Sequence, residues 1–217
     1  IFVFYFSLIS YKVLKRRRQR LNIIFSAFFI TIIIANILNM IYGAMTYHMV
    51  ILILNFFTNF FLCFGPIFIL IVNMIILEST LIFSVKRQNR FIILYGILLL
   101  LSMIPFYAFD QVWIEDLRPH FSGLFLFYIL SFPTALAVIP IIYTSFKIYS
   151  SFETKTLKKK WYIYSIGTIG AFSIAYLVWI SNFVFQDGFR LIVSFYSITV
   201  IIWGFFMYYG IGFKLKQ

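Results

Sequence analysis

A few polar side chains interrupt a sequence that is otherwise apolar, and they decide which chemistry is open to the chain. Glu78 is the one acidic or basic residue in the stretch Leu52–Phe83. A carboxylate inside a membrane costs a few kcal/mol unless it is paired, protonated or hydrated. We therefore expect Glu78 to face the interior of a helical bundle, either as a signal-relay or proton-linked group or as a polar clamp between helices.

Two pairs of asparagines have helical spacing. Asn36 and Asn39 are three residues apart, and Asn55 and Asn59 are four apart, so each pair lies on one face of its helix. The two helices are consecutive and antiparallel, so the two faces can meet, with Asn182 nearby. One interpretation is a small polar pocket that opens outward and binds a ligand. The other is a set of hydrogen bonds that hold the helices together.

Prolines lie inside two of the apolar stretches. Pro66 follows Gly65 in one of them, and Pro133 and Pro140 lie in the stretch Leu124–Phe146. Each proline removes a backbone hydrogen bond. We expect kinks at these positions, and the hypothesis is that they act as hinges.

Residue patterns of common catalytic and metal sites are missing from the sequence. Cys63 is the single cysteine, and His48 and His120 stand alone in predicted loops. A metal site needs several His, Cys or carboxylate groups that converge, and intramembrane proteolysis needs paired polar groups deep in the bilayer. We therefore expect no enzyme activity, no metal and no cofactor in this segment.

Composition identifies an integral membrane protein. Apolar residues make up 63% of the 217 residues and charged residues 11%, whereas soluble domains have roughly 45–50% and about 25%. One crossing needs roughly 20 apolar residues. The fold class expected is all-α, a single polytopic bundle of seven transmembrane helices over residues 1–217. We interpret Ile1–Ile9 as the end of a truncated first helix, and six spans follow: Leu21–Tyr42, Leu52–Phe83, Phe91–Ala108, Leu124–Phe146, Tyr164–Ile180 and Leu191–Phe213.

The distribution of basic residues predicts the orientation. With seven crossings, sixteen of the 18 Lys and Arg residues share one side, and only Arg118 and Arg190 lie on the other. The positive-inside rule then places the amino terminus outside and the carboxyl terminus in the cytoplasm, in the plasma membrane. The net charge of +12 is thus a topology signal that attracts anionic lipids of the inner leaflet and does not indicate nucleic-acid binding. An overlong segment, Gly43–Asn55, is interpreted as an interfacial link into a long, tilted or kinked helix.

Several seven-helix classes are excluded by their missing residues. A retinal pigment needs a lysine in its last helix, and Leu191–Phe213 has none. A G-protein-coupled receptor carries an acidic-Arg-aromatic triplet at the inner end of its third helix and Asn-Pro-x-x-Tyr in its last. Neither occurs in this sequence.

One pattern around Glu78 resembles a known family. A basic cluster at 15–18 precedes an apolar helix, a short link and a helix with a central Pro66 that ends in Leu77-Glu78-Ser79-Thr80, followed by Lys86-Arg87. This order resembles the amino-terminal seven-helix sensor region of archaeal and bacterial histidine kinases, with Glu78 and Thr80 at matching positions. The resemblance implies a membrane sensor that passes a signal to a cytoplasmic kinase, PAS or cyclase-type module after residue 217.

The function expected is a sensor or receptor-like membrane domain that detects a small ligand or a membrane property. Its expected partners are a cytoplasmic signalling module or a membrane subunit, and a second copy of the chain as a homodimer. Two alternatives stay open. The chain could be a transporter or channel subunit that uses Glu78, or a structural subunit of a membrane complex.

Overall fold

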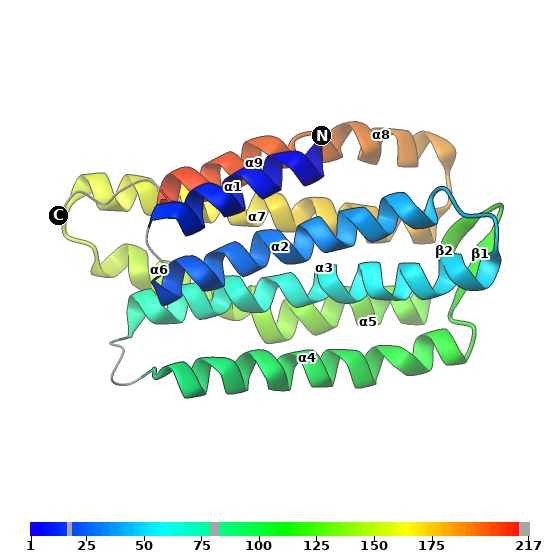
Figure 1. Ribbon diagram of the computed structural model, residues 1–217, viewed down its shortest axis with the longest axis horizontal. Helices are drawn as coiled ribbons and strands as arrows, with labels where there is room; N and C mark the ends of the chain where they lie inside the picture. Colours follow the sequence, from blue (N-terminus) through cyan, green and yellow to red (C-terminus); the bar gives the residue numbers. More distant parts are fainter. Residues whose placement is uncertain (17–18, 79–82, 213–217) are drawn as a thin grey trace.

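The computed structural model describes residues 1–16, 19–78 and 83–212, which form an elongated helical bundle (Figure 1). The all-α prediction is confirmed apart from one short hairpin, β1 (Val112–Glu115) and β2 (Arg118–Phe121). Two π-helical turns, η1 (Thr134–Val138) and η2 (Tyr208–Gly212), follow α5 and α9. The α-helices are α1 (Phe2–Arg16), α2 (Arg20–Tyr42), α3 (His48–Leu77), α4 (Val85–Ala108), α5 (Gly123–Pro133), α6 (Ile139–Ser151), α7 (Lys155–Val184), α8 (Asp187–Ser197) and α9 (Val200–Met207).

Six segments are long and apolar enough to cross a membrane, which confirms the prediction of an integral membrane protein. They are Arg20–Tyr42, His48–Leu77, Val85–Ala108, Gly123–Ser151, Lys155–Val184 and Asp187–Ile211. The outer helix α4 exposes a row of large apolar side chains, among them Ile97 at 49%, Leu98 at 54% and Leu101 at 60%. A surface of this kind is stable against lipid and unfavourable in water.

The short first helix lies along α2 and α9. It has 15 residues, or roughly 22 Å at 1.5 Å per residue, and so falls short of the roughly 30 Å of hydrocarbon. Its amino-terminal end lies about midway along the bundle (Figure 1). The seventh crossing and the orientation of the termini therefore remain predictions.

Helix α3 forms the centre of the bundle. Of its most apolar stretch, 56% is buried, against 17% for α4. It has 30 residues, roughly 45 Å, which agrees with the long helix expected after Gly43. The predicted bounds Leu52–Phe83 are wrong, because α3 begins at His48 and ends at Leu77. Of the residues between Leu77 and Phe83, 79–82 lie outside the described ranges.

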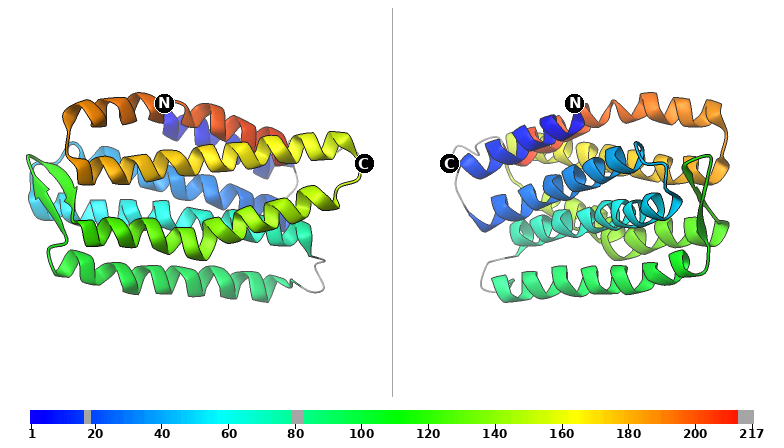
Figure 2. Two further views of the ribbon diagram at one scale, coloured as in Figure 1. Left: turned by 180° about the vertical axis from the view of Figure 1, so that it is seen from behind. Right: turned by 45° about the vertical axis from the view of Figure 1, so that its right-hand side comes forward.

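The two ends of the bundle differ in charge, and Figures 1 and 2 show which elements lie at each end. The hairpin end holds the α2–α3 link, the β1–β2 hairpin and the α7–α8 link. The opposite end, called the basic end here, holds the starts of α2, α4 and α7 and the ends of α1 and α6. Within the described ranges, Arg118 and Arg190 are the two Lys or Arg residues at the hairpin end.

The hairpin was expected to be a loop, and the structure corrects this. Val112 pairs with Phe121 and Glu115 with Arg118 in an antiparallel register. The two turn residues have positive φ, 48° at Asp116 and 59° at Leu117. This is the pattern of a type I′ turn, which usually carries glycine or asparagine. Since Leu117 occupies a glycine position, the sequence lacks the usual turn signal.

The predicted kink between Pro133 and Pro140 is present. Pro133 ends α5, the π-helical turn η1 follows, and Pro140 is in the first turn of α6. The span bends at this point in the left view of Figure 2. Pro66 differs, because α3 remains helical on both sides of it. The role of these prolines as hinges stays a hypothesis.

A candidate ligand cavity at the hairpin end

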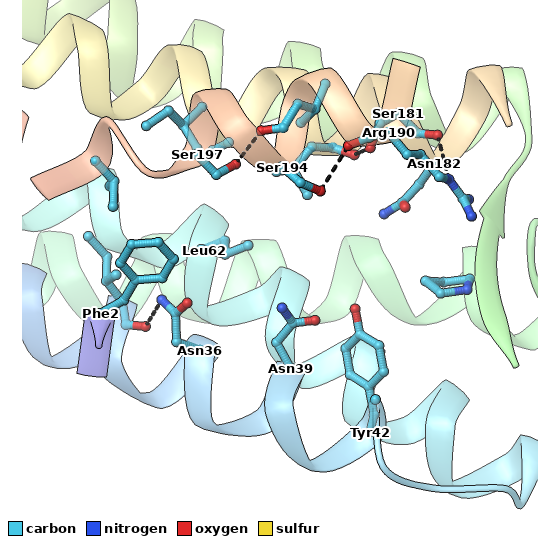
Figure 3. A pocket seen from close by; sticks show the side chains of 18 of the residues that line it. Phe2, Asn36, Asn39, Tyr42, Leu62, Ser181, Asn182, Arg190, Ser194 and Ser197 are labelled. Carbon is cyan, nitrogen blue, oxygen red and sulfur yellow. Dashed lines mark hydrogen bonds between the residues drawn. The ribbon is translucent and has the colours of Figure 1, made fainter. Parts of the chain in front are cut away.

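A cavity of about 700 Å³ lies between α1, α2, α3, α7 and α8, with the hairpin turn at one end (Figure 3). Ligand pockets for small molecules commonly measure about 300–1,000 Å³. The cavity is therefore large enough for a small organic molecule.

The lining changes from apolar to polar along the bundle. Near the middle of the bundle it is formed by residues such as Phe6, Phe28, Ile32, Leu62, Pro66 and Phe172. Toward the hairpin end it is formed by Asn36, Asn39, Tyr42, Asn182, Arg190 and Ser194. Such a lining matches a molecule whose apolar part points toward the middle of the bundle and whose polar part points toward the hairpin end.

Helix α2 supplies one polar wall of the cavity. Figure 3 shows Asn36, Asn39 and Tyr42 pointing toward α7 and α8. The amide of Asn36 donates to its own helix at the Ile32 carbonyl, at 2.8 Å. Asn182 lies on the opposite wall. Two of the four asparagines expected in a pocket therefore line this cavity, together with Asn182.

The other two asparagines are placed in a closed hydrogen-bond network. The amide nitrogen of Asn59 donates to Asn55 Oδ1 at 3.0 Å and to the Tyr107 hydroxyl at 2.9 Å. Tyr107 donates to Asn55 Oδ1 at 2.9 Å, and Trp179 Nε1 donates to Asn59 Oδ1 at 3.1 Å. The network joins α3, α4 and α7. Asn55 and Asn59 are not among the residues that line the cavity, so the structure does not bring all four asparagines into one pocket.

Tyr42 connects the cavity with this network. Its hydroxyl lies close enough to the Asn55 side chain and to Arg190 to be affected electrostatically by both. Tyr42 therefore lies between the cavity and the network that joins α3, α4 and α7.

Arg190 lines the cavity wall together with two other charged residues, Asp116 and Arg118. Its Nε donates to the Ser181 carbonyl at 3.3 Å, and its guanidinium carbon lies 4.1 Å from the centre of the Phe185 ring. Phe185 ends α7 in the left-handed conformation, with φ of 60°. This conformation lets the chain reverse into α8 and brings Arg190 back over the end of α7.

Two buried polar atoms at this end lack hydrogen-bond partners among the described residues. They are Arg190 Nη2 and His120 Nε2. His120 is 6% exposed, and its ring packs on Trp113 and Phe185. Its Nε2 is 3.8 Å from Glu115 Oε2. Burial lowers the pKa of His120, and Arg190 lowers it further, while Glu115 and Asp116 raise it.

The structure also contains a polar network in the half of the bundle nearer the basic end, which was not expected. Asn73 is fully buried and donates to the hydroxyls of Thr144 and Ser145, each at 3.0 Å. Tyr164 donates to Asn73 Oδ1 at 3.3 Å, and Trp161 Nε1 donates to the Ser145 carbonyl at 2.9 Å. Asn73 thus ties α3 to α6 and α7. It could have been noticed as an amide inside an apolar run.

Glu78 is not inside a spanning helix, and that part of the prediction is wrong. It follows the last residue of α3 with extended backbone angles, and its amide donates to the Met74 carbonyl at 2.9 Å. Ending α3 at Leu77 brings the carboxylate to the basic end of the bundle, which avoids the cost of burial in hydrocarbon. Its proposed role in signal relay or proton coupling stays a hypothesis.

Metal and thiol chemistry receive no support at this site. Among residues 1–16, 19–78 and 83–212, no three His, Cys, Asp or Glu side chains come together as metal ligands. Cys63 is buried. The polar groups that line the cavity are amides, hydroxyls, the guanidinium groups of Arg118 and Arg190 and the carboxylate of Asp116, and they can bind polar and charged groups.

A second, smaller cavity lies between α6 and α7 on the lipid side. It measures about 320 Å³ and is lined by mostly apolar residues, among them Ile142, Phe146 and Ile169. Those three side chains are exposed at the surface of the bundle. None of the described residues that line it is charged, whereas charged residues line the larger cavity.

Comparison with known proteins gives no family assignment. No protein-family model, curated protein or solved structure matches the chain. The class that the fold defines is therefore an integral-membrane helical bundle with an amphipathic cavity. The resemblance to the sensor region of histidine kinases, expected from the residue pattern around Pro66 and Glu78, stays a prediction, and Thr80 of that pattern lies outside the described residues.

Proposed function

We propose that this chain is a sensor or receptor-like membrane domain that binds a small amphipathic molecule in the cavity at the hairpin end. The observation that carries the proposal is the lining of that cavity. It is apolar at Phe28 and Leu62 and polar at Asn39, Asn182 and Arg190. Such a gradient fits a ligand that enters with its apolar part first.

The proposed orientation places the hairpin end outside the plasma membrane and the basic end in the cytoplasm. Charge supports this, because the Lys and Arg residues of the described ranges lie at the basic end except for Arg118 and Arg190. Cytoplasmic ends of membrane helices carry such an excess. The proposed ligand then reaches the cavity from the outside or from the outer leaflet.

Two elements that line the cavity continue toward the basic end. Pro66 lies in the middle of α3, which continues to Leu77. Val200 begins α9, directly after the interruption at Ile198 and Thr199. A ligand that binds one arrangement of these helices more tightly than another shifts the population of the two. This gives the proposed route by which occupancy of the cavity reaches a cytoplasmic partner.

A distance measurement across the basic end tests this function. Spin labels at Lys12→Cys and Lys155→Cys, in a Cys63→Ala background, report the separation of α1 and α7 in nanodiscs by pulsed electron resonance. The probe is dodecanol, a neutral single-chain amphiphile. We expect dodecanol to shift the distance distribution, because the cavity contacts both α1 and α7.

The cavity requirement is tested with a double substitution. Asn39→Leu with Asn182→Leu should abolish the shift by removing two polar groups from opposite walls. Asn89→Leu makes the same change at an exposed position at the basic end and should leave the shift intact. An unchanged distance in the parent protein, at a dodecanol concentration shown by direct binding to fill the cavity, would overturn the sensor proposal. Transport of dodecanol across proteoliposomes, or a pH-dependent flux lost in Glu78→Gln, would assign a transporter instead.

A further inference from the structure

Arg190 narrows the chemistry of the ligand, and the inference drawn from it rests on the proposed function. Its side chain lines the polar end of the cavity (Figure 3). Two contacts hold it in place, the bond from Nε to the Ser181 carbonyl and the Phe185 ring under the guanidinium. The group is therefore positioned before any ligand arrives, and a positioned group loses less freedom on binding.

One edge of this guanidinium is unused. Nη2 is buried and has no hydrogen-bond partner within the ranges that the structure describes. A buried donor without a partner is unfavourable, and a charged donor especially so. Arg190 also lines the cavity, so the accessible part of the same guanidinium presents a positive charge at the cavity wall, where an anionic oxygen can bind it.

The acidic side chains near Arg190 do not bind its guanidinium. Asp187 Oδ1 accepts a hydrogen bond from Arg118 Nη1 at 2.8 Å, so this carboxylate is engaged by another arginine. Asp116 also lines the cavity, but it is exposed at the hairpin turn, and no ion pair joins it to Arg190 among the described residues. Tyr42 faces Arg190 from α2 and supplies a hydroxyl rather than a charge. Charge complementarity at Arg190 is therefore left to a ligand.

The remainder of the cavity suits a single alkyl chain. From Arg190 the lining continues past Ser194 and Ser197 to Val200, Phe28 and Leu62. Asn39, Asn182 and Tyr42 provide further hydrogen-bonding groups around the head. An anion with a long apolar tail satisfies both ends of the cavity at once.

We propose that the cavity binds a single-chain alkyl carboxylate, with its carboxylate on Arg190 and its alkyl chain directed toward Phe28 and Leu62. Arginine is well suited to this partner, since its planar fork matches the two oxygens of a carboxylate. The ligand class is therefore a fatty-acid-like anion, as distinct from a neutral alcohol or a two-chain phospholipid.

Binding of two probes of equal length tests the charge requirement. Radiolabelled dodecanoate and dodecanol are titrated into the full-length protein in phosphatidylcholine nanodiscs, and uptake by empty nanodiscs is subtracted. We expect dodecanoate to bind at least about tenfold more tightly than dodecanol. Arg190→Gln should weaken dodecanoate binding about tenfold to a hundredfold and leave dodecanol unchanged. Arg190→Lys, which keeps the charge and loses the fork, should fall between the two.

Controls separate this inference from the proposed function. Arg90→Gln removes an exposed arginine at the basic end and should leave both affinities unchanged. If Arg190→Gln unfolds, Arg190→Lys in the same titration decides the result.

If both probes bind equally and substitutions at Arg190 leave both affinities unchanged, the carboxylate assignment is overturned while the sensor proposal stands. Competition by phosphatidylglycerol in the nanodiscs would overturn the single-chain assignment. Binding of neither probe would overturn both proposals, and a cavity filled by the protein's own chain would give that result.

Discussion

The guanidinium carbon of Arg190 lies 4.1 Å from the centre of the Phe185 ring. Phe185 is the residue at which α7 ends with a left-handed conformation, and His120 packs on the same ring. One aromatic side chain thus contacts both residues whose buried nitrogen atoms lack partners in the described part of the chain. The end of α7 therefore determines how the polar end of the cavity is built.

Replacing Phe185 should weaken binding at Arg190 without removing the charge. A cation–π contact of this kind contributes about 0.5–1 kcal/mol, so Phe185→Leu should weaken dodecanoate binding roughly two- to fivefold. The titration in nanodiscs measures the change. Phe183→Leu is the matched control, because Phe183 is 46% exposed on the same helix and should have no effect. Equal losses in the two variants would show that the Phe185 ring does not position Arg190.

The asparagine network should contribute to stability, whereas Asn36 should not. Asn59→Leu removes two donated bonds and leaves Trp179 Nε1 without its acceptor. Hydrogen bonds between membrane helices average about 0.6 kcal/mol each, so the loss should be about 2 kcal/mol in the free energy of unfolding. Asn36→Leu removes a bond to its own helix backbone and should cost little. Thermal unfolding in detergent compares the two, and equal losses would contradict the assignment of Asn59 to helix packing.

The hairpin end should lose stability in mild acid. Burial lowers the pKa of His120 below its ordinary value of 6.5, so the unfolded chain binds more protons than the folded one in this range. The contribution to stability is complete above about pH 6.5 and declines as the pH falls through the lowered folded-state pKa. His120→Phe should reduce this decline. His48→Gln, at an exposed position, should leave it unchanged, and the melting temperature as a function of pH measures both.

Close packing of α7 on α9 should depend on Gly167. A methyl group at this position would lie 2.8 Å from the Met207 nitrogen and the Trp203 oxygen, both of which are backbone atoms. Gly167→Ala should therefore force the helices apart and cost about 1–3 kcal/mol. Gly188→Ala is a suitable control, since nothing lies within 4 Å of the added carbon. If both variants melt at the same temperature, α7 and α9 are not packed as described.

The spans could be predicted because long apolar runs have few alternatives in a chain of this composition. The sequence also predicts that Asn36 and Asn39 share one face of their helix, because residues three apart in any α-helix lie on the same side. The partners of Asn59 could not be predicted, because Trp179 is 120 residues away and reaches it only after α7 has packed on α3. The sequence predicts Arg190 as an outer charge, but its position at the cavity depends on the chain reversal at Phe185. The hairpin went unpredicted because Leu117 stands where a turn usually has glycine.

Cysteine labelling should establish the orientation in intact cells. Cys63 is fully buried, so single cysteines introduced at the surface can be labelled above a low background. Leu117→Cys lies in the hairpin turn, and Thr156→Cys lies in the first turn of α7 at the basic end. Because the basic end is proposed to face the cytoplasm, a maleimide that does not cross membranes should label residue 117 in intact cells and residue 156 only after lysis. The reverse pattern would place the cavity mouth in the cytoplasm and would require its ligand to come from inside the cell.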